Sequence, residues 1–256
     1  MSRIVWGCVL VPPPEAAPAT DVYDFHQRAE LHGARRFPER DEELVELPDP
    51  RTYRSLSRAA LLLAASGVQA RPALGPHLAR DPFRVGIYCA TEPGPNDYVC
   101  ARKMTDTPPG EFAEVYRSLR APTQYLKQLA NVAPAQLAIL LGATGPLSVF
   151  THSRQAGFQA LEAADHDLEN GHVDAALACS AFALEDALVN LRARRGRPEE
   201  VVISEASVSV VLLADGLRKD WRSLSQPEQG IFYGIADVLV SIAKRRPLDV
   251  RSADVR

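Results

Sequence analysis

The residues that could do chemistry gather at one predicted turn, where His152, Ser153 and Arg154 stand between an apolar segment and a helical one. A strand that passes sharply into a helix points the turn side chains and the first helical N–H groups at the same spot. That spot carries a positive partial charge, which can lower the pKa of a thiol nucleophile and stabilise an oxyanion. Arg154 serves neither purpose, because a guanidinium cannot attack a carbonyl and its charge has the wrong sign for a helix N-terminus.

His152 and Ser153 suggest a different chemistry, in which the histidine would activate the hydroxyl for attack. Adjacent residues on a strand point to opposite faces, so the two side chains would not usually meet. A structural role therefore explains the pair better than a catalytic one. A small acyltransferase or thioesterase that uses Ser153 or His152 stays open as an alternative.

A second polar group lies between positions 165 and 172 and could be interpreted as a set of metal ligands. Its members are Asp165, His166, Asp167, Glu169 and His172. Charges on the exposed face of a helix explain the group better than a metal does. We therefore predict no metal site and no cofactor.

The elements that must position this turn alternate between strand and helix patterns. Strands are predicted over 4–11, 83–90, 147–152, 174–183, 201–203 and 207–214, and helices over 51–69, 111–120, 126–141, 154–170 and 231–244. We expect surface excursions at 12–50 and 92–110, a loop at 72–81, and the end of the first helix at Gly67. Such alternation predicts an α/β protein with a mixed or largely parallel sheet. We expect one domain over 1–256.

Composition narrows the possible classes of function. The chain has 256 residues, 46% of them hydrophobic and 24% charged, and a net charge of −3, as in an ordinary globular protein. We predict no nucleic-acid partner, because the one basic run, 192–197, is better explained as an exposed loop. The first apolar run is too short to span a membrane, so we predict no membrane insertion. The four cysteines lack C-x-x-C spacing, which favours free thiols and a cytoplasmic location.

The segment 120–185 resembles the nucleophile region of β-ketoacyl-ACP synthases, which belong to the thiolase superfamily. It contains a proline-led segment, Asn131, the pair Gly145-Pro146, an apolar strand, a turn, a helix of small residues, and Gly171 followed by Asp174. The catalytic cysteine of the family then falls on Arg154. The resemblance implies the N-terminal half of a thiolase-like fold, a layered α-β-α arrangement with a mixed five-stranded sheet. The C-terminal half would be truncated, with 216–256 as its remnant.

Other parts of the family pattern are changed or missing. Condensing ketosynthases use two histidines from the C-terminal half, and this chain has none from position 173 to 256. Glu205 resembles the acid of the family's G-E-G-A-G turn, with Ser204 and Ala206 in place of the two glycines. The small residues at the start of the helix 154–170 predict contact with two neighbouring layers.

The resemblance implies a non-catalytic subunit similar to the chain-length factors, in particular the shorter ones of aryl-polyene type II polyketide pathways. Its partner would be an active β-ketoacyl-ACP synthase in a heterodimer, with an acyl carrier protein involved indirectly. The implied partner interface is Leu147, Ser148, Val149, Phe150, Thr151 and His152; the implied end of the acyl tunnel is Thr123, Gln124, Tyr125 and Phe150. A stand-alone acyl-binding module is the second alternative.

Overall fold

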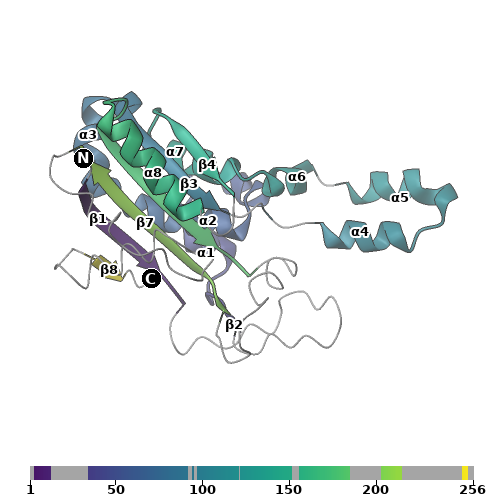
Figure 1. The fold of residues 1–256 in the computed structure, drawn as a ribbon. Helices are drawn as coiled ribbons and strands as arrows, with labels where there is room; N and C mark the ends of the chain where they lie inside the picture. Colours follow the sequence, from purple (N-terminus) through teal and green to yellow (C-terminus); the bar gives the residue numbers. More distant parts are fainter. Residues whose placement is uncertain are drawn as a thin grey trace.

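A mixed sheet with helices on both faces forms the body of the molecule (Figure 1). The structure is a computed structural model that describes residues 3–12, 34–91, 94, 97–120, 122–151, 156–184, 203–214 and 250–252. The main sheet has the order β4-β3-β5-β7-β1-β8. Its strands are β1 (Arg3–Leu10), β3 (Val85–Thr91), β4 (Leu147–Phe150), β5 (Ala175–Phe182), β7 (Ala206–Leu213) and β8 (Val250–Ser252). The first five form the predicted five-stranded sheet, and the three-residue β8 adds a sixth strand.

The direction of the strands changes once on each side of β7. Strand β3 is parallel to both β4 and β5, whereas β7 is antiparallel to both β5 and β1, and β8 is parallel to β1. The sheet is therefore mixed, as the sequence predicts. A separate two-stranded pair joins β2 (Ala34–Arg35) to β6 (Ile203–Ser204).

Alternate residues of the central strands supply two separate hydrophobic cores. On β3, Ile87 and Cys89 face one core and Tyr88 and Ala90 face the other, as the two-residue period of a strand requires. All residues of β3 and β5 are buried. The sheet is thus covered on both faces, which confirms the predicted α-β-α layering.

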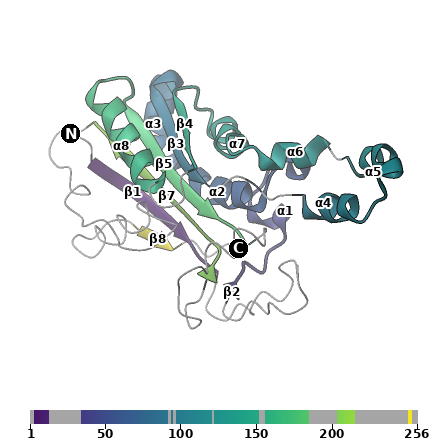
Figure 2. The same ribbon diagram turned by 45° about the vertical axis from the view of Figure 1, so that its right-hand side comes forward.

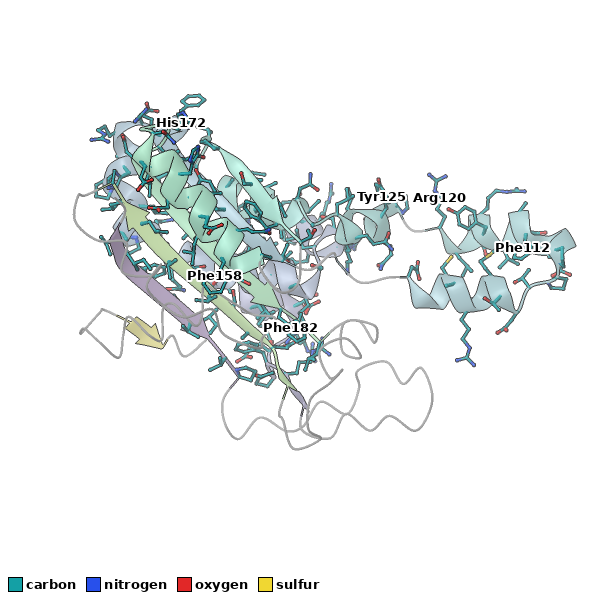
Figure 3. All side chains as sticks on the ribbon, viewed as in Figure 1. Phe112, Arg120, Tyr125, Phe158, His172 and Phe182 are labelled. Atoms are coloured by element: carbon teal, nitrogen blue, oxygen red, sulfur yellow. The ribbon has the colours of Figure 1, made fainter. Side chains whose placement is uncertain are left out.

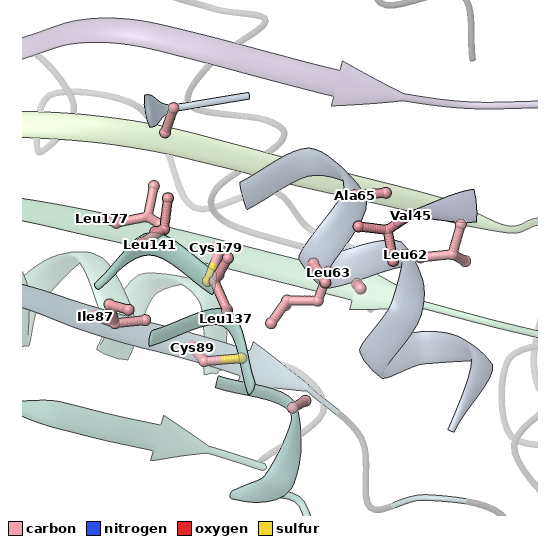
Figure 4. Close-up of a cluster of buried hydrophobic side chains, with 14 of the residues drawn as sticks. Val45, Leu62, Leu63, Ala65, Ile87, Cys89, Leu137, Leu141, Leu177 and Cys179 are labelled. Atoms are coloured by element: carbon pink, nitrogen blue, oxygen red, sulfur yellow. The ribbon is translucent and has the colours of Figure 1, made fainter. Parts of the chain in front are cut away.

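The first core lies between the sheet and two helices, α2 (Arg58–Val68) and α7 (Val132–Leu141) (Figure 4). Leu62 and Leu63 of α2 and Leu137 of α7 are fully buried there. Full burial of one such side chain stabilises the fold by roughly 1.5–3 kcal/mol. The second core lies under α8 (Ala156–Glu169), which covers the opposite face of the sheet (Figure 2).

The segment 51–69 holds two elements where one helix was predicted. A 3-10 turn, η1 (Pro50–Ser55), comes first, and α2 begins after Ser57, whose hydroxyl accepts a hydrogen bond from the Ala60 N–H at 3.1 Å. The helix also continues past Gly67, which was predicted to end it. Gly67 is buried against Leu137 of α7, where a Cβ would lie 2.5 Å from the Leu137 side chain. This glycine therefore lets two helices approach closely.

The predicted loop at 72–81 was wrong, because α3 (Arg71–Arg80) occupies it. Pro72 lies in the first turn of α3, where its missing N–H costs nothing. Pro76 does remove one hydrogen bond inside the helix. Leu74, however, is fully buried, so packing outweighs the local signal of the prolines.

The structure also has helices in three further segments where the sequence analysis predicted excursions or one longer helix. The excursion 92–110 contains α4 (Tyr98–Thr105), whose first turn is capped by Asp97 accepting from the Cys100 N–H at 2.9 Å. The helix predicted over 126–141 is two helices, α6 (Pro122–Gln128) and α7. Pro134 explains the break, because its ring excludes a continuous helix through the preceding turn. The excursion 12–50 contains α1 (Asp41–Leu44).

The remaining elements follow the predictions closely. Between α3 and β3 lies η2 (Pro82–Arg84), and η3 (Pro109–Glu111) leads into α5 (Phe112–Leu119), where a helix was predicted. Gly171 (φ 67°) ends α8 in the left-handed conformation that glycine adopts without strain. The predicted helix 231–244 and the run 192–197 lie outside the described residues.

Candidate functional site

Strand β4 forms one edge of the sheet. It pairs with β3, and within the described part of the chain no strand pairs with its other edge. Leu147 is 39% exposed, Ser148, Val149 and Phe150 are half-buried, and Thr151 is exposed. Gly145 and Pro146 place the strand, since the Pro146 carbonyl accepts from the Ile87 N–H at 2.8 Å. A Cβ on Gly145 would overlap the backbone of Val85, so only glycine allows this approach.

A strand and a helix lie on either side of positions 152–155, as predicted. His152, Ser153 and Arg154 themselves lie outside the described residues. The described helix begins at Ala156, and both Ala156 and Gly157 are buried at its start. The predicted strand and helix on either side of these residues are thus confirmed, while the turn itself and the roles assigned to His152, Ser153 and Arg154 stay predictions.

Helix α8 buries one face and exposes the other. Ala160, Leu161 and Ala164 pack on the sheet, whereas Glu162 and His166 are exposed. The small residues thus contact one layer among the described residues, where two layers were predicted. Next to the edge strand, the exposed face borders a shallow groove. Its lining is Phe150, Gln159, Glu162, Ala163 and His166.

The four residues predicted to form a tunnel end come from two elements, α6 and β4. Thr123, Gln124 and Tyr125 are on α6, where Tyr125 is 63% exposed (Figure 3). Phe150 lies at the end of β4, packs against the core under α8 and lines the groove described above. The residues that share this groove with Phe150 come from α8.

A polar bridge ties the far end of α8 to the sheet. The buried Tyr88 hydroxyl donates to Asp167 Oδ2 at 2.6 Å, and His172 Nδ1 lies 3.1 Å from Asp167 Oδ1. Partial burial of Asp167 raises the pKa of its carboxyl, but the hydrogen bonds from Tyr88 and His172 outweigh burial and hold that pKa below its usual value. Burial, with the contact to Asp167, raises the pKa of Tyr88. These groups act as a structural clamp in the described structure.

Asp174 has a structural role that accounts for the Gly-x-x-Asp pattern. Arg84 donates to Asp174 Oδ1 at 2.7 Å and to the Gly171 carbonyl at 2.8 Å, and Arg80 also donates to Asp174. The hydrogen bonds from Arg84, despite a smaller effect of burial, hold the pKa of Asp174 below its usual value. The network joins the starts of β3 and β5.

Glu205 is a fully buried carboxylate at the junction of β6 and β7. It accepts from the Phe37 N–H at 3.0 Å, the Leu184 N–H at 3.2 Å and Arg58 Nε at 2.9 Å, and Arg36 Nε lies 3.5 Å away. A buried carboxylate needs such partners because desolvation alone would cost several kcal/mol. Glu205 therefore organises the backbone around it.

Arg58 is the member of this network that the sequence analysis missed. Its side chain is buried and also donates to Asp41 Oδ1 at 2.7 Å and to the Phe37 carbonyl at 2.8 Å. Burial opposes its charge, but the contacts to Glu205 and Asp41 raise the pKa of the guanidinium. The available signal was a lone arginine at the start of an otherwise apolar helix.

Metal ligation and membrane insertion find no support in the described residues. No group of three or more His, Cys, Asp or Glu side chains there could hold a metal ion. The rings of His166 and His172 are 6.4 Å apart, and His172 already contacts Asp167. Within the same residues no helix combines the length and the apolar composition that a membrane span requires.

Comparison with known protein families and with characterised proteins finds no match. Solved structures do match. A chain of AntDE:AntF, described as a type II PKS acyl-carrier protein in complex with its ketosynthase bound to the hexaketide, has a TM-score of 0.56 and 20% identity. That match covers 70% of this chain and 53% of that one.

A β-ketoacyl synthase from Burkholderia phymatum STM815 matches with a TM-score of 0.51 and 17% identity, over 82% of this chain and 52% of that one. The ishigamide ketosynthase/chain length factor matches with a TM-score of 0.50 and 14% identity, over 70% and 49%. The chain thus spans about half the length of the solved chains that it matches. It has a ketosynthase-like, thiolase-type fold.

Proposed function

We propose, from this ketosynthase-like fold, that the chain is a non-catalytic subunit that forms a heterodimer with an active β-ketoacyl-ACP synthase. The observation that carries the proposal is the edge of β4, which no other strand of the described residues pairs with. In the sequence this strand is followed by Arg154, at the position where the family has its cysteine. In such a pair the ketosynthase would do the chemistry. This chain would stabilise it and shape its acyl tunnel.

The edge of β4 supports an intermolecular contact. An edge strand presents unpaired N–H and C=O groups that another strand can satisfy. The strand is short, carries the apolar Leu147 at 39% exposure, and has no charged residue within Leu147–Phe150. The usual protections of a free edge, such as lysine or proline within the strand, are therefore lacking.

The chemistry expected of a ketosynthase is not available from the sequence at the family's positions. Arg154 falls at the position of the family's nucleophile and cannot form a thioester. We therefore assign the condensation reaction to the partner. A type II pathway such as those that make aryl polyenes, located in the cytoplasm, is the setting we propose, with the acyl carrier protein contacting the pair through the ketosynthase.

The first test is co-expression with the ketosynthase encoded nearest to this chain, followed by size-exclusion chromatography with mass determination. A stable one-to-one complex supports the proposal. A chain that stays alone with every neighbouring ketosynthase contradicts it. In that case an acyl adduct that is lost in Ser153→Ala would favour the small acyltransferase or thioesterase.

The tunnel role predicts an effect on product length. In the complex, Tyr125→Ala or Phe150→Ala should lengthen or broaden the distribution of product chain lengths, because each removes an aromatic ring from the proposed tunnel end. Thr123→Ala and Gln124→Ala test smaller changes on α6, next to Tyr125. Product chains are measured by mass spectrometry, and Phe83→Ala, at a 69% exposed position beside α3, is the matched control. Unchanged chain lengths for all four substitutions would refute the tunnel role alone.

A further inference from the structure

A helical hairpin projects from the body of the molecule (Figures 1 and 2). It consists of α4, η3 and α5, which we call the arm, residues 98–119. The main contacts of α4 and α5 are with each other and with η3 rather than with the sheet or its covering helices. The arm is therefore held by little besides its own two helices.

The arm carries apolar side chains that its own packing leaves uncovered. On α5, Phe112, Val115, Tyr116 and Leu119 recur at the spacing of one helical face. Val115 and Leu119 are half-buried, whereas Phe112 is 37% and Tyr116 51% exposed. Isolated helices shorter than about 12 residues are marginal in water, and α4 and α5 have eight residues each. A covering surface would stabilise the hairpin.

The exposed apolar residues continue from the arm towards the edge of the sheet. Tyr125 and Leu126 on α6 are 63% and 40% exposed, and α6 follows α5 directly in the chain. Figure 3 places Phe112 towards the far end of the arm, with Tyr125 on α6 between the arm and the sheet. The arm is thus continuous with the region that contains the tunnel residues proposed above.

The edge of β4 is too short to provide the buried area of a stable interface by itself. A four-residue strand is only about 13 Å long, whereas a stable interface buries about 800 Å² on each partner. Pairing through β4 alone would therefore be too small to hold a lasting heterodimer. The exposed apolar side chains of α6 and the arm are available to supply the missing area.

We infer that the arm is a clasp that lies on the ketosynthase partner and becomes rigid when the complex forms. This inference rests on the proposed function and extends it to a second contact surface. The partner surface it fits is apolar and accepts two aromatic rings, since charges on the arm are balanced. The region 97–120 carries four basic residues (Arg102, Lys103, Arg117, Arg120) and four acidic ones (Asp97, Asp106, Glu111, Glu114).

The test compares the ketosynthase affinity of the wild type with that of the double variant Phe112→Ser/Tyr116→Ser. We expect at least about a tenfold loss, because buried aromatic side chains dominate most interfaces. The matched control is Glu114→Ser/Arg117→Ser, on exposed positions of the same helix, which should bind within about twofold of the wild type. Calorimetric titration with the purified ketosynthase gives both values.

Hydrogen exchange on the wild-type chain supplies a second readout that needs no variant. Amides of residues 98–119 should exchange rapidly in the free chain and slowly in the complex, while amides of β3 and β5 stay protected in both. Equal affinity of the double variant together with unprotected arm amides would overturn the clasp and leave the heterodimer intact. A wild type that binds no ketosynthase overturns the proposed function instead, and a homodimer broken by the double variant would assign the arm to a second copy.

Discussion

The pairing of Arg58 with Glu205 is the residue-scale feature with the largest consequence for stability. Both side chains are buried, and the contact spans 147 positions of the chain. It joins the start of α2 to the junction of β6 and β7, and through Phe37 it also fixes the segment that leads to α1. One ion pair thus holds three distant segments together.

Glu205→Gln should destabilise the fold by roughly 3–5 kcal/mol, because it leaves the Arg58 charge buried without its main counter-ion. Urea unfolding followed by circular dichroism measures the change. Glu46→Gln, at an exposed position, is the control and should stay within about 0.5 kcal/mol of the wild type. A loss below about 1 kcal/mol for Glu205→Gln would mean that the backbone donors, not the ion pair, hold this junction.

At the scale of elements, the contact between α8 and β3 depends on a titratable group. Asp167 has a lowered pKa in the folded state, owing to the hydrogen bonds from Tyr88 and His172 that outweigh its burial. The unfolded chain therefore takes up a proton at Asp167 first, near its ordinary pKa of about 3.9. The stabilisation is complete above that pH and is lost as the pH falls through the folded pKa.

The melting temperature of Asp167→Asn should accordingly lie below that of the wild type at neutral pH, and the gap should narrow as the pH falls below about 4. Thermal melts of both proteins between pH 3 and 7 measure the gap. Asp106→Asn, an exposed position in the arm, is a control for general charge effects. A gap that stays constant over this range would contradict the role of the Asp167 carboxylate.

Local patterns were enough to predict the sheet but not all of the helices. Strands β3 and β5 are apolar runs that follow Pro82 and Gly171, so their positions were predicted within two residues. Helix α3 was missed because Pro72 and Pro76 suggest a loop, and only the burial of Leu74 in the tertiary structure reverses that signal. Helix α4 was missed because its N-cap, Asp97, follows the segment 92–96, whose proline and glycine residues predict a loop.

In the candidate site, too, some features could be predicted from the sequence and others depend on tertiary packing. The presence of β4 and the helix after it follow from the order of the predicted elements, whereas the exposed edge of β4 was implied only by the family resemblance. The short helix α6 that carries Thr123, Gln124 and Tyr125 could not be predicted, because it depends on the break before Pro134. The contact between Arg58 and Glu205 could not be predicted either, because nothing in the sequence relates an arginine at the start of a helix to an acid 147 positions away.

On the scale of the whole molecule, the reactivity of the thiols reports how tightly the first core is packed, because Cys8, Cys89 and Cys179 all belong to it. Cys8, Cys89 and Cys179 are buried, and Cys100 on α4 is partly exposed. Burial raises the pKa of the Cys8 thiol to about 11. The hydrogen bond with Cys179, together with burial, raises the pKa of Cys89. Protonated, enclosed thiols react slowly.

Iodoacetamide at pH 8 should therefore modify Cys100 first in the native protein and all four cysteines after denaturation. Peptide mass spectrometry at increasing times gives the rate at each position. Modification of Cys89 or Cys179 at a rate comparable to that of Cys100 would mean that the sheet opens far more often than its burial suggests.

The pairing of β1 with β7 also governs how the protein is made. Arg3 is opposite Leu213 in the register, so β1 leaves the ribosome long before β7, the strand that it pairs with. At synthesis rates of about 5–20 residues per second, β1 waits on the order of 10–40 seconds for β7. During that interval Trp6 and the apolar residues beside it have no partner strand, so the nascent chain is a natural client for a ribosome-associated chaperone.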